Sequence, residues 1–206
     1  MEVLNKTTDI DKYLQAGKLT QPFLYSDYIL DRVMCDYNAR LNQNKNANML
    51  QSLYLWIDHN VEFCKDKDFC DRYKFQRTAK EIWESKKMTG CTDYCLLFAT
   101  FARQIGIPTT FLHTAEEGWL DRLKNNEDYK VHYGHSFCEC FYNNQWVLVD
   151  PTIKKIQTNY DLEPINLEYK VAGNSVFMPY MRSLDLDKKQ SVKQHNEEMD
   201  NICLTL

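Results

Sequence analysis

Three residues of different types, far apart in the sequence, form a set that could carry out thiol chemistry. They are Cys91, His135 and Asp150. A cysteine is a strong nucleophile as a thiolate, a neighbouring histidine can take up and return its proton, and a carboxylate can orient the histidine ring. The set can act only if the elements that carry these residues bring them together.

Cys91 stands at the start of a segment that is predicted to be a buried helix. Residues 91–105 are apolar on nearly all sides. Gly106 lies where a left-handed C-terminal residue belongs, and Pro108 prevents the helix from continuing. The free N–H groups and the positive end of the helix dipole then face Cys91, and both favour its thiolate form.

His135 and Asp150 lie at the two open ends of a predicted β-hairpin. Residues 135–142 alternate between two faces, and a turn and a returning strand follow in residues 143–150. Residues at the open ends of an antiparallel pair are cross-strand neighbours, so we expect His135 and Asp150 to lie within reach of each other. Glu139 shares the face of His135 and is a candidate to support it. If the hairpin packs on the start of the buried helix, all three residues of the set meet.

The chemistry expected of this set is covalent acyl transfer at an amide. His135 takes the thiol proton, the Cys91 thiolate attacks the carbonyl carbon, and a thioester forms as the amine leaves; water or a second amine then resolves it. The reaction also needs hydrogen-bond donors for the oxyanion. The backbone N–H of Cys91 is one candidate from helix geometry, and the side chains of Trp56 and Trp83 are considered for the second.

The rest of the chain predicts an α+β domain with helices first and strands after them. The expected elements are helices at 26–33, 49–63 and 78–86, an irregular charged loop at 64–75 and a strand at 109–113. After these come a charged loop or flap at 116–130, for which a helix around Trp119–Leu123 is also considered, one or two strands within 162–180, and a surface helix within 185–200.

The composition limits what the chain can bind and where it resides. The 206 residues are 44% hydrophobic and 26% charged, which is close to the average of globular domains. At a formal net charge of −4 the chain lacks the positive field that would hold a nucleic acid, so no nucleic-acid partner is expected. No stretch approaches the roughly 20 apolar residues of a membrane span. Residues 1–12 contain no apolar signal-peptide core. We therefore expect a cytoplasmic protein without a membrane partner.

The eight cysteines indicate neither a zinc motif nor a disulfide framework. The chain has enough apolar residues to fold without disulfides, and its spacings contain no Cys-x-x-Cys pair. We expect most of the thiols to be buried, and we expect no metal and no cofactor. Cys95, one helical turn after Cys91, is a rival nucleophile. His132 is a rival base, although the strand alternation favours His135.

Two stretches resemble motifs of the transglutaminase-like superfamily. Residues 90–108, GCTDYCLLFATFARQIGIP, are similar to the family's nucleophile helix, which begins at the catalytic cysteine and ends in Gly-Ile-Pro. Residues 134–152, GHSFCECFYNNQWVLVDPT, are similar to its His strand and its Trp-x-x-x-Asp-Pro-Thr strand. The resemblance implies that Cys91 is the nucleophile, His135 the base and Asp150 the orienting acid. One departure is that glycine directly precedes Cys91, where many members have Gly-x-Cys.

The resemblance extends over about residues 49–156 and implies a papain-like α+β core, in which a buried nucleophile helix packs on an antiparallel β-sheet, as in small bacterial-type members. Residues 49–206 would form the catalytic domain, with a motif-bearing core at 78–156, and residues 1–48 an N-terminal extension that is mostly helical or irregular. The implied activity is that of a cysteine peptidase or amidase, or of a protein-glutamine acyltransferase, with a peptide or protein substrate. The alternatives are a catalytically inactive binding module of the same fold and a zinc-binding structural protein.

Overall fold

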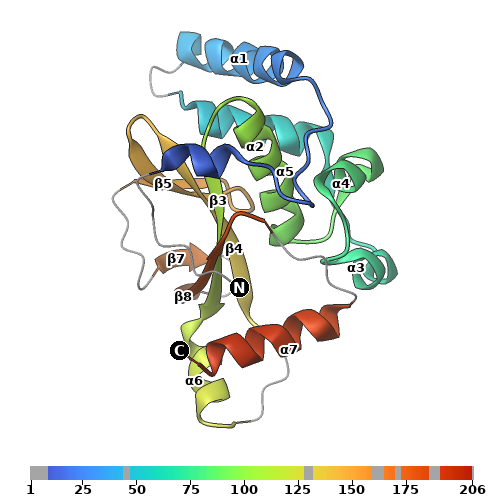
Figure 1. The fold of residues 1–206 in the computed structure, drawn as a ribbon, viewed down its shortest axis with the longest axis vertical. Coiled ribbons are helices and arrows are strands. Elements are labelled where there is room, and N and C mark those ends of the chain that lie inside the picture. Colours follow the sequence, from blue (N-terminus) through green and yellow to red (C-terminus); the bar gives the residue numbers. More distant parts are fainter. Residues whose placement is uncertain are drawn as a thin grey trace.

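The chain folds into a group of helices followed by a sheet (Figure 1). The computed structural model describes residues 9–43, 47–127, 132–158, 165–169, 173–185 and 191–205. The helices are a 3₁₀ helix at Ile10–Leu14, α1 (Ser26–Gln43), α2 (Met49–Asn60), α3 (Lys67–Tyr73), α4 (Ala79–Ser85), α5 (Cys91–Gln104), α6 (Glu117–Lys124) and α7 (Val192–Cys203). The strands are β1 (Glu62–Phe63), β2 (Lys87–Met88), β3 (Thr109–Glu116), β4 (Gly134–Tyr142), β5 (Gln145–Asp150), β6 (Lys155–Thr158), β7 (Ile165–Tyr169) and β8 (Gly173–Ser183). Among these helices, none is both long and apolar enough to cross a membrane.

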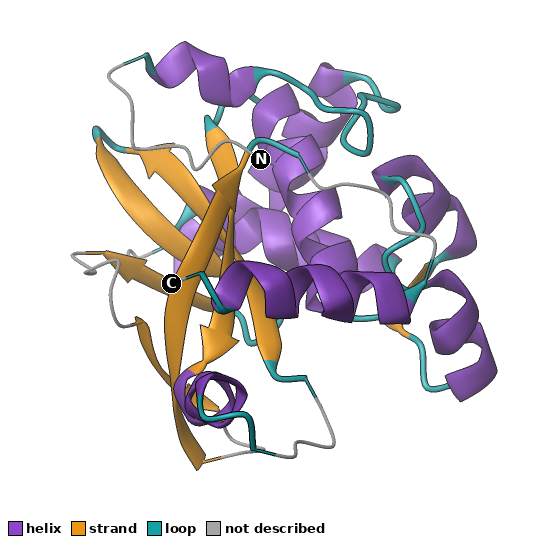
Figure 2. Ribbon diagram, turned by 60° about the horizontal axis from the view of Figure 1, so that its bottom comes forward, coloured by secondary structure: helices purple, strands orange, loops and turns teal. Residues whose placement is uncertain are grey.

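The main sheet has six strands in the order β6-β5-β4-β3-β8-β7. Every neighbouring pair in it is antiparallel, and β4 and β5 form the predicted hairpin. Figure 2 shows the strands on one side of the molecule and most of the helices on the other. The predicted α+β class, with a helix layer on an antiparallel sheet, is therefore confirmed.

α5 is the central helix of the core, as its apolar composition predicts. Its residues 93–103 are all buried, and it belongs to the same apolar cluster as Phe111 of β3 and Cys138 of β4. The helix ends as predicted, because Gly106 has φ +82°, in the left-handed region that glycine adopts without strain. The N–H of Gly106 and that of the next residue bond back to carbonyl oxygens in the last turn of the helix.

Two local predictions need correction. Residues 64–75 are not all irregular, because α3 forms within them and Asp66 caps its start by accepting from the N–H of Phe69. The helix predicted at 26–33 continues to Gln43. The helix considered around Trp119–Leu123 is present as α6, and it buries Trp119 and two leucines. Burial of these side chains stabilises so short a helix.

The segments outside the predicted core pack against it. Arg103, at the end of α5, donates to the hydroxyl of Thr20 at 3.1 Å and to the carbonyl oxygen of Leu184 at 2.6 Å. The N-terminal residues Leu19, Ile29 and Val33 belong to the apolar cluster around α5. A second cluster joins α6, β8 and α7 and contains Ala115, Trp119, Leu120, Leu123, Tyr180, Met199 and Cys203. Both ends of the chain therefore contribute to the body that surrounds α5, and the boundary predicted after residue 48 stays a prediction.

Candidate active site

Cys91 is the first residue of α5, and the chain that leads to it is held by a small sheet. β2 pairs in parallel with β1, and the N–H of Cys64 donates to the carbonyl oxygen of Met88 at 2.8 Å. These contacts fix the chain up to Thr89, two residues before Cys91. The first-turn N–H groups and the positive dipole end of α5 then face Cys91, as predicted. Cys91 is partly exposed as a residue, while its thiol is buried.

A buried ion pair holds the first turn of α5. Asp93 Oδ2 accepts hydrogen bonds from the N–H and the hydroxyl of Thr89, both at 2.7 Å, and from Arg77 Nη2 at 2.5 Å. The side chains of Arg77 and Asp93 are only 6% and 1% exposed. Arg77 also donates to the Ser85 hydroxyl and to the Lys87 carbonyl oxygen. Asp93 therefore joins the entry of α5 to α4 and β2.

Replacing Asp93 by Ala is expected to lower the free energy of unfolding by about 3–5 kcal/mol, because it leaves the Arg77 guanidinium buried without its counter-charge. Lys80→Ala is the matched control. It breaks an ion pair with Glu84 in which both side chains are more than half exposed, and it should change the free energy by less than about 0.5 kcal/mol. Urea unfolding of both variants measures the difference. Equal, small changes would show that the buried pair does not stabilise the fold.

His135 and Asp150 are in contact at the edge of the predicted hairpin. His135 Nε2 lies 2.6 Å from Asp150 Oδ2, and the two side chains are 5% and 1% exposed. The two residues therefore lie within reach of each other, as expected, although they are not directly opposite. The register pairs Cys138 with Val149, so Asp150 falls opposite Phe137 and diagonal to His135. Diagonal residues on one face of an antiparallel pair still lie within reach of a long side chain, which is why the contact survives the offset.

The two carboxylate oxygens of Asp150 have separate tasks. While Oδ2 contacts His135, Oδ1 accepts from the backbone N–H groups of Thr152 at 2.9 Å and Ile153 at 3.3 Å. This second pair of bonds is the side-chain turn that aspartate commonly forms. The turn after β5 thereby fixes the direction of the carboxylate, so one residue both ends the strand and orients the histidine ring.

Cys91 and His135 interact as a charged pair. Because Asp150 occupies Nε2, the ring nitrogen that remains for the Cys91 thiol is Nδ1. Burial would raise the pKa of Cys91, but the charge of His135 and hydrogen bonds from His135 and the Ser136 backbone outweigh it and lower that pKa. Burial would lower the pKa of His135, whereas the Cys91 thiolate and Asp150 raise it to about 10. Both shifts favour the thiolate and the imidazolium.

Cys95, the rival nucleophile, has different surroundings. It is fully buried, and its thiol donates to the carbonyl oxygen of Ser136 at 3.2 Å. Burial, followed by the neighbouring thiol of Cys138, raises the pKa of Cys95 well above its ordinary value. A buried thiol with a raised pKa stays protonated and serves in packing. The environment therefore favours Cys91 over Cys95 as the reactive thiol.

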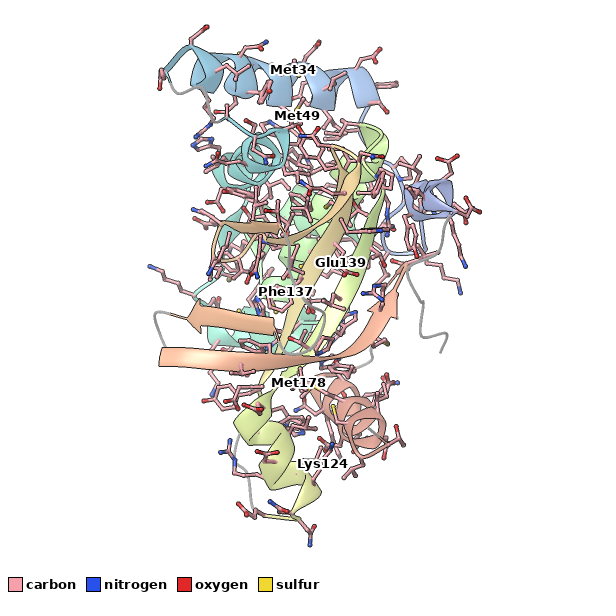
Figure 3. All side chains as sticks on the ribbon, turned by 90° about the vertical axis from the view of Figure 1, so that its left-hand side faces the viewer. Met34, Met49, Lys124, Phe137, Glu139 and Met178 are labelled. Atoms are coloured by element: carbon pink, nitrogen blue, oxygen red, sulfur yellow. The ribbon has the colours of Figure 1, made fainter. Side chains whose placement is uncertain are left out.

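Two further candidates are engaged in contacts between elements. His132 Nε2 lies 2.9 Å from Asp200 Oδ1 on α7. Glu139 forms a buried, two-point ion pair with Arg182, which reaches across β3 from β8; its Nη2 lies 2.9 Å from Glu139 Oε1. Figure 3 shows Glu139 on β4 in the middle of the molecule. These contacts join β4 and the chain before it to β8 and α7.

The tryptophans considered as oxyanion donors lie at the other end of α5. Trp56 and Trp83 pack against each other and against Phe101, with ring centroids 5.0–5.1 Å apart. Phe101 follows Cys91 by ten residues, which corresponds to about 15 Å along a helix. The suggestion that either tryptophan assists at Cys91 is therefore wrong, because both side chains fill the core.

A cleft lies beside Cys91. Besides Cys91 and His135 it is lined by Lys74, Phe75, Gly90, Thr92, His113, His132, Gly134, Ser136, Tyr180, His195, Asn196 and Met199. The arrangement thus places a low-pKa thiol, an imidazole and a carboxylate in series at the wall of a cavity, which is what covalent acyl transfer requires.

The sequence reasoning missed the contribution of β8 and α7 to this cleft. Tyr180 lies on β8, and His195, Asn196 and Met199 lie on α7 (Figure 1). These residues line the cleft together with the first residues of α5 and of β4. A signal for α7 was present, since Val192, His195, Met199 and Cys203 recur at helical spacing. The pattern indicates a buried face but does not say what that face covers.

The zinc-binding alternative finds no support in the described part of the chain. There, no three His, Cys, Asp or Glu side chains are grouped so that they could hold a metal ion.

Comparison with known proteins connects this site to a family. The model of the transglutaminase-like superfamily matches residues 36–151, which is more than half of the chain and includes Cys91, His135 and Asp150. A similar solved structure is that of a protein from Cytophaga hutchinsonii described as a "Putative Cysteine Protease", with a TM-score of 0.51 and 16% sequence identity over 87% of this chain and 48% of that one. This chain therefore spans about half the length of that structure, and the likeness concerns the fold. No curated protein sequence matches the chain. From the match over the segment that carries the three residues, and from the fold around them, the chain belongs to the transglutaminase-like superfamily.

Proposed function

We propose that the chain is a thiol enzyme that transfers the acyl group of an amide in a peptide or protein, with Cys91 as nucleophile, His135 as proton carrier and Asp150 as orienting acid. The observation that carries the proposal is the series of contacts from Asp150 to His135 and from His135 to Cys91. The family supports it, because the matched segment contains all three residues. The cleft beside Cys91 supports it as well, because a substrate carbonyl needs room there.

The proposed reaction begins from the thiolate–imidazolium pair. The Cys91 sulfur attacks the carbonyl carbon, a C–S bond forms, and the carbonyl electrons move to the oxygen. When this intermediate collapses, the C–N bond breaks and His135 gives its proton to the leaving nitrogen. A thioester on Cys91 results. His135, now neutral, takes a proton from water or from a second amine as that molecule attacks the thioester, and the Cys91 thiolate leaves.

The start of α5 supplies the proposed oxyanion donor. The backbone N–H groups of a first helical turn point out of the helix end, and the positive dipole end favours negative charge beside it. The N–H of Cys91 belongs to this turn. The ion pair of Asp93 with Arg77 holds the turn in place, so the donor is fixed before the substrate arrives.

Alkylation by iodoacetamide tests the activated thiol directly. At about pH 6 we expect Cys91 to react well before the exposed Cys35, because a lowered pKa leaves more thiolate at low pH. In His135→Ala the positive charge is lost, so the reactivity curve of Cys91 should move to higher pH. Mass spectrometry of the labelled peptides measures the rates of alkylation. Equal labelling of both cysteines would instead favour an inactive binding module.

The pH dependence of activity gives a separate prediction. The rate of catalysis should fall as the pH rises through about 10, where His135 loses its proton.

The product of the second step separates hydrolysis from transfer, which share the same first step. Peptides incubated with the enzyme in the presence and absence of putrescine are analysed by mass spectrometry. A new carboxyl terminus or a deamidated side chain indicates that water resolves the thioester, and an amine adduct indicates transfer. We expect hydrolysis, and the similarity of the fold to a protein described as a cysteine protease supports this expectation.

A further inference from the structure

A second cavity adjoins the cleft beside Cys91. The two cavities share part of their walls, namely Phe75, Thr92, His113, Tyr180, His195 and Met199. Thr92 directly follows Cys91 on α5, so the shared wall begins beside the nucleophile. A substrate held with its carbonyl at Cys91 would therefore have part of its chain at the entrance of the second cavity.

The second cavity, called here the side pocket, has a largely apolar lining. Four aliphatic or thioether side chains form it in addition to the shared wall: Leu19, Leu96, Met181 and Ile202. The charged groups on its border are engaged in other contacts. Arg77 is paired with Asp93, Asp185 Oδ2 accepts from the N–H of Leu19 at 2.9 Å, and Glu198 Oε1 accepts from the side-chain amide of Gln194 at 3.2 Å. An apolar cavity with a few polar groups at its border has the composition that is typical of ligand sites.

The side pocket is built mostly by segments outside the family match at residues 36–151. Leu19 comes from the N-terminal segment, Met181 from β8, and Met199 and Ile202 from α7. In Figure 2 the C-terminal helix lies across the junction of the strand layer and the helix layer. The terminal segments thus supply most of the side pocket, while the proposed catalytic residues lie within the matched segment.

We propose that the side pocket binds a large apolar side chain of the substrate, such as leucine or phenylalanine, close to the carbonyl that Cys91 attacks. The inference rests on the proposed function, because it needs a substrate at Cys91. Moving an apolar side chain from water into an apolar cavity is favourable, whereas a charged side chain would lose its hydration there. We therefore expect a preference of at least about tenfold for apolar over charged side chains.

Peptidyl vinyl sulfones test this preference on the full chain. They alkylate a thiolate by addition, so the second-order rate of labelling at Cys91 reports recognition. In a series that places Leu, Phe, Lys or Glu at each position next to the electrophile, one position should favour Leu and Phe over Lys and Glu by at least about tenfold. Equal labelling rates for Leu, Phe, Lys and Glu at every position would overturn the proposal, and this result needs no variant of the protein.

Two variants and a matched control then assign the preference to the side pocket. Ile202→Trp and Met181→Trp fill the pocket and should remove the preference. Leu204→Trp places the same ring on a side chain that is 56% exposed, just beyond the end of α7, and should leave the preference unchanged. A preference that survives both filling variants would overturn the assignment.

Iodoacetamide separates failure of the pocket from failure of the active site. It is small enough to reach Cys91 without using the side pocket, so its rate should be the same in the unaltered chain and in all three variants. If iodoacetamide labels Cys91 selectively but the vinyl sulfones show no side-chain preference, only the proposal for the side pocket is overturned. Loss of selective labelling in the unaltered chain overturns the proposed function and, with it, the side pocket.

Discussion

Replacing Cys91 by Ala is expected to lower kcat/KM by about four to six orders of magnitude, because in the proposed reaction the sulfur of Cys91 forms the covalent intermediate. The fold should remain intact. Cys91 is partly exposed at the first position of α5, and alanine is the residue most compatible with a helix. Activity is measured on the peptides that are incubated with the enzyme with and without putrescine, and folding is measured by circular dichroism and thermal unfolding.

Cys95→Ala is the matched control for this variant. Both cysteines lie on α5, one helical turn apart, but Cys95 is fully buried and donates to the carbonyl oxygen of Ser136. Its replacement should therefore cost some stability through lost packing and leave kcat/KM within a few-fold of the unaltered chain. The reverse pattern, with activity retained in Cys91→Ala and lost in Cys95→Ala, would assign the nucleophile to Cys95.

Replacing Asp150 by Asn is expected to lower kcat by about 10³- to 10⁴-fold with little change in stability. Asparagine removes the negative charge that holds His135 in its protonated, correctly oriented form, since the contact between Asp150 Oδ2 and His135 Nε2 is only 2.6 Å. Its side-chain oxygen can still accept from the N–H groups of Thr152 and Ile153, so the turn after β5 is kept. The activity of the variant is followed by single-turnover and steady-state kinetics.

Asp150→Ala shows whether the carboxylate acts on chemistry or only on folding. It should lose a similar amount of activity, and it should also lower the melting temperature, because the two N–H groups of the turn lose their acceptor. A role in orienting His135 therefore predicts that activity falls equally in both variants while stability falls only in Asp150→Ala. If the activity of Asp150→Asn is unchanged, Asp150 is only a turn residue.

The elements that carry the site could be predicted because their signals are local. The uniform apolar character of residues 91–105 indicates a helix buried on all sides, and Gly106 and Pro108 mark its end. The alternation from His135 and the turn before Trp146 indicate a hairpin. Each of these patterns depends on residues within a few positions of one another, so one sequence suffices to read it.

The details that depend on register and distant packing could not be predicted in this way. The diagonal placement of His135 and Asp150 follows from the pairing of Cys138 with Val149, and a single sequence does not state the register of a strand pair. Trp56 and Trp83 are aromatic residues before the nucleophile helix, and nothing in their spacing shows that they pack on Phe101 instead of near Cys91.

Patterns within the sequence are enough to predict that α5 begins at a cysteine, that a histidine and an aspartate border one hairpin, and that these residues resemble those of a known family. The fold adds which cysteine meets the histidine, how Asp150 shares its two oxygens between the ring and the turn, and that β8 and α7 line the cleft beside Cys91. Secondary structure follows from interactions between near neighbours in the chain, whereas the walls of a cavity are formed by residues that folding brings together from distant parts of it.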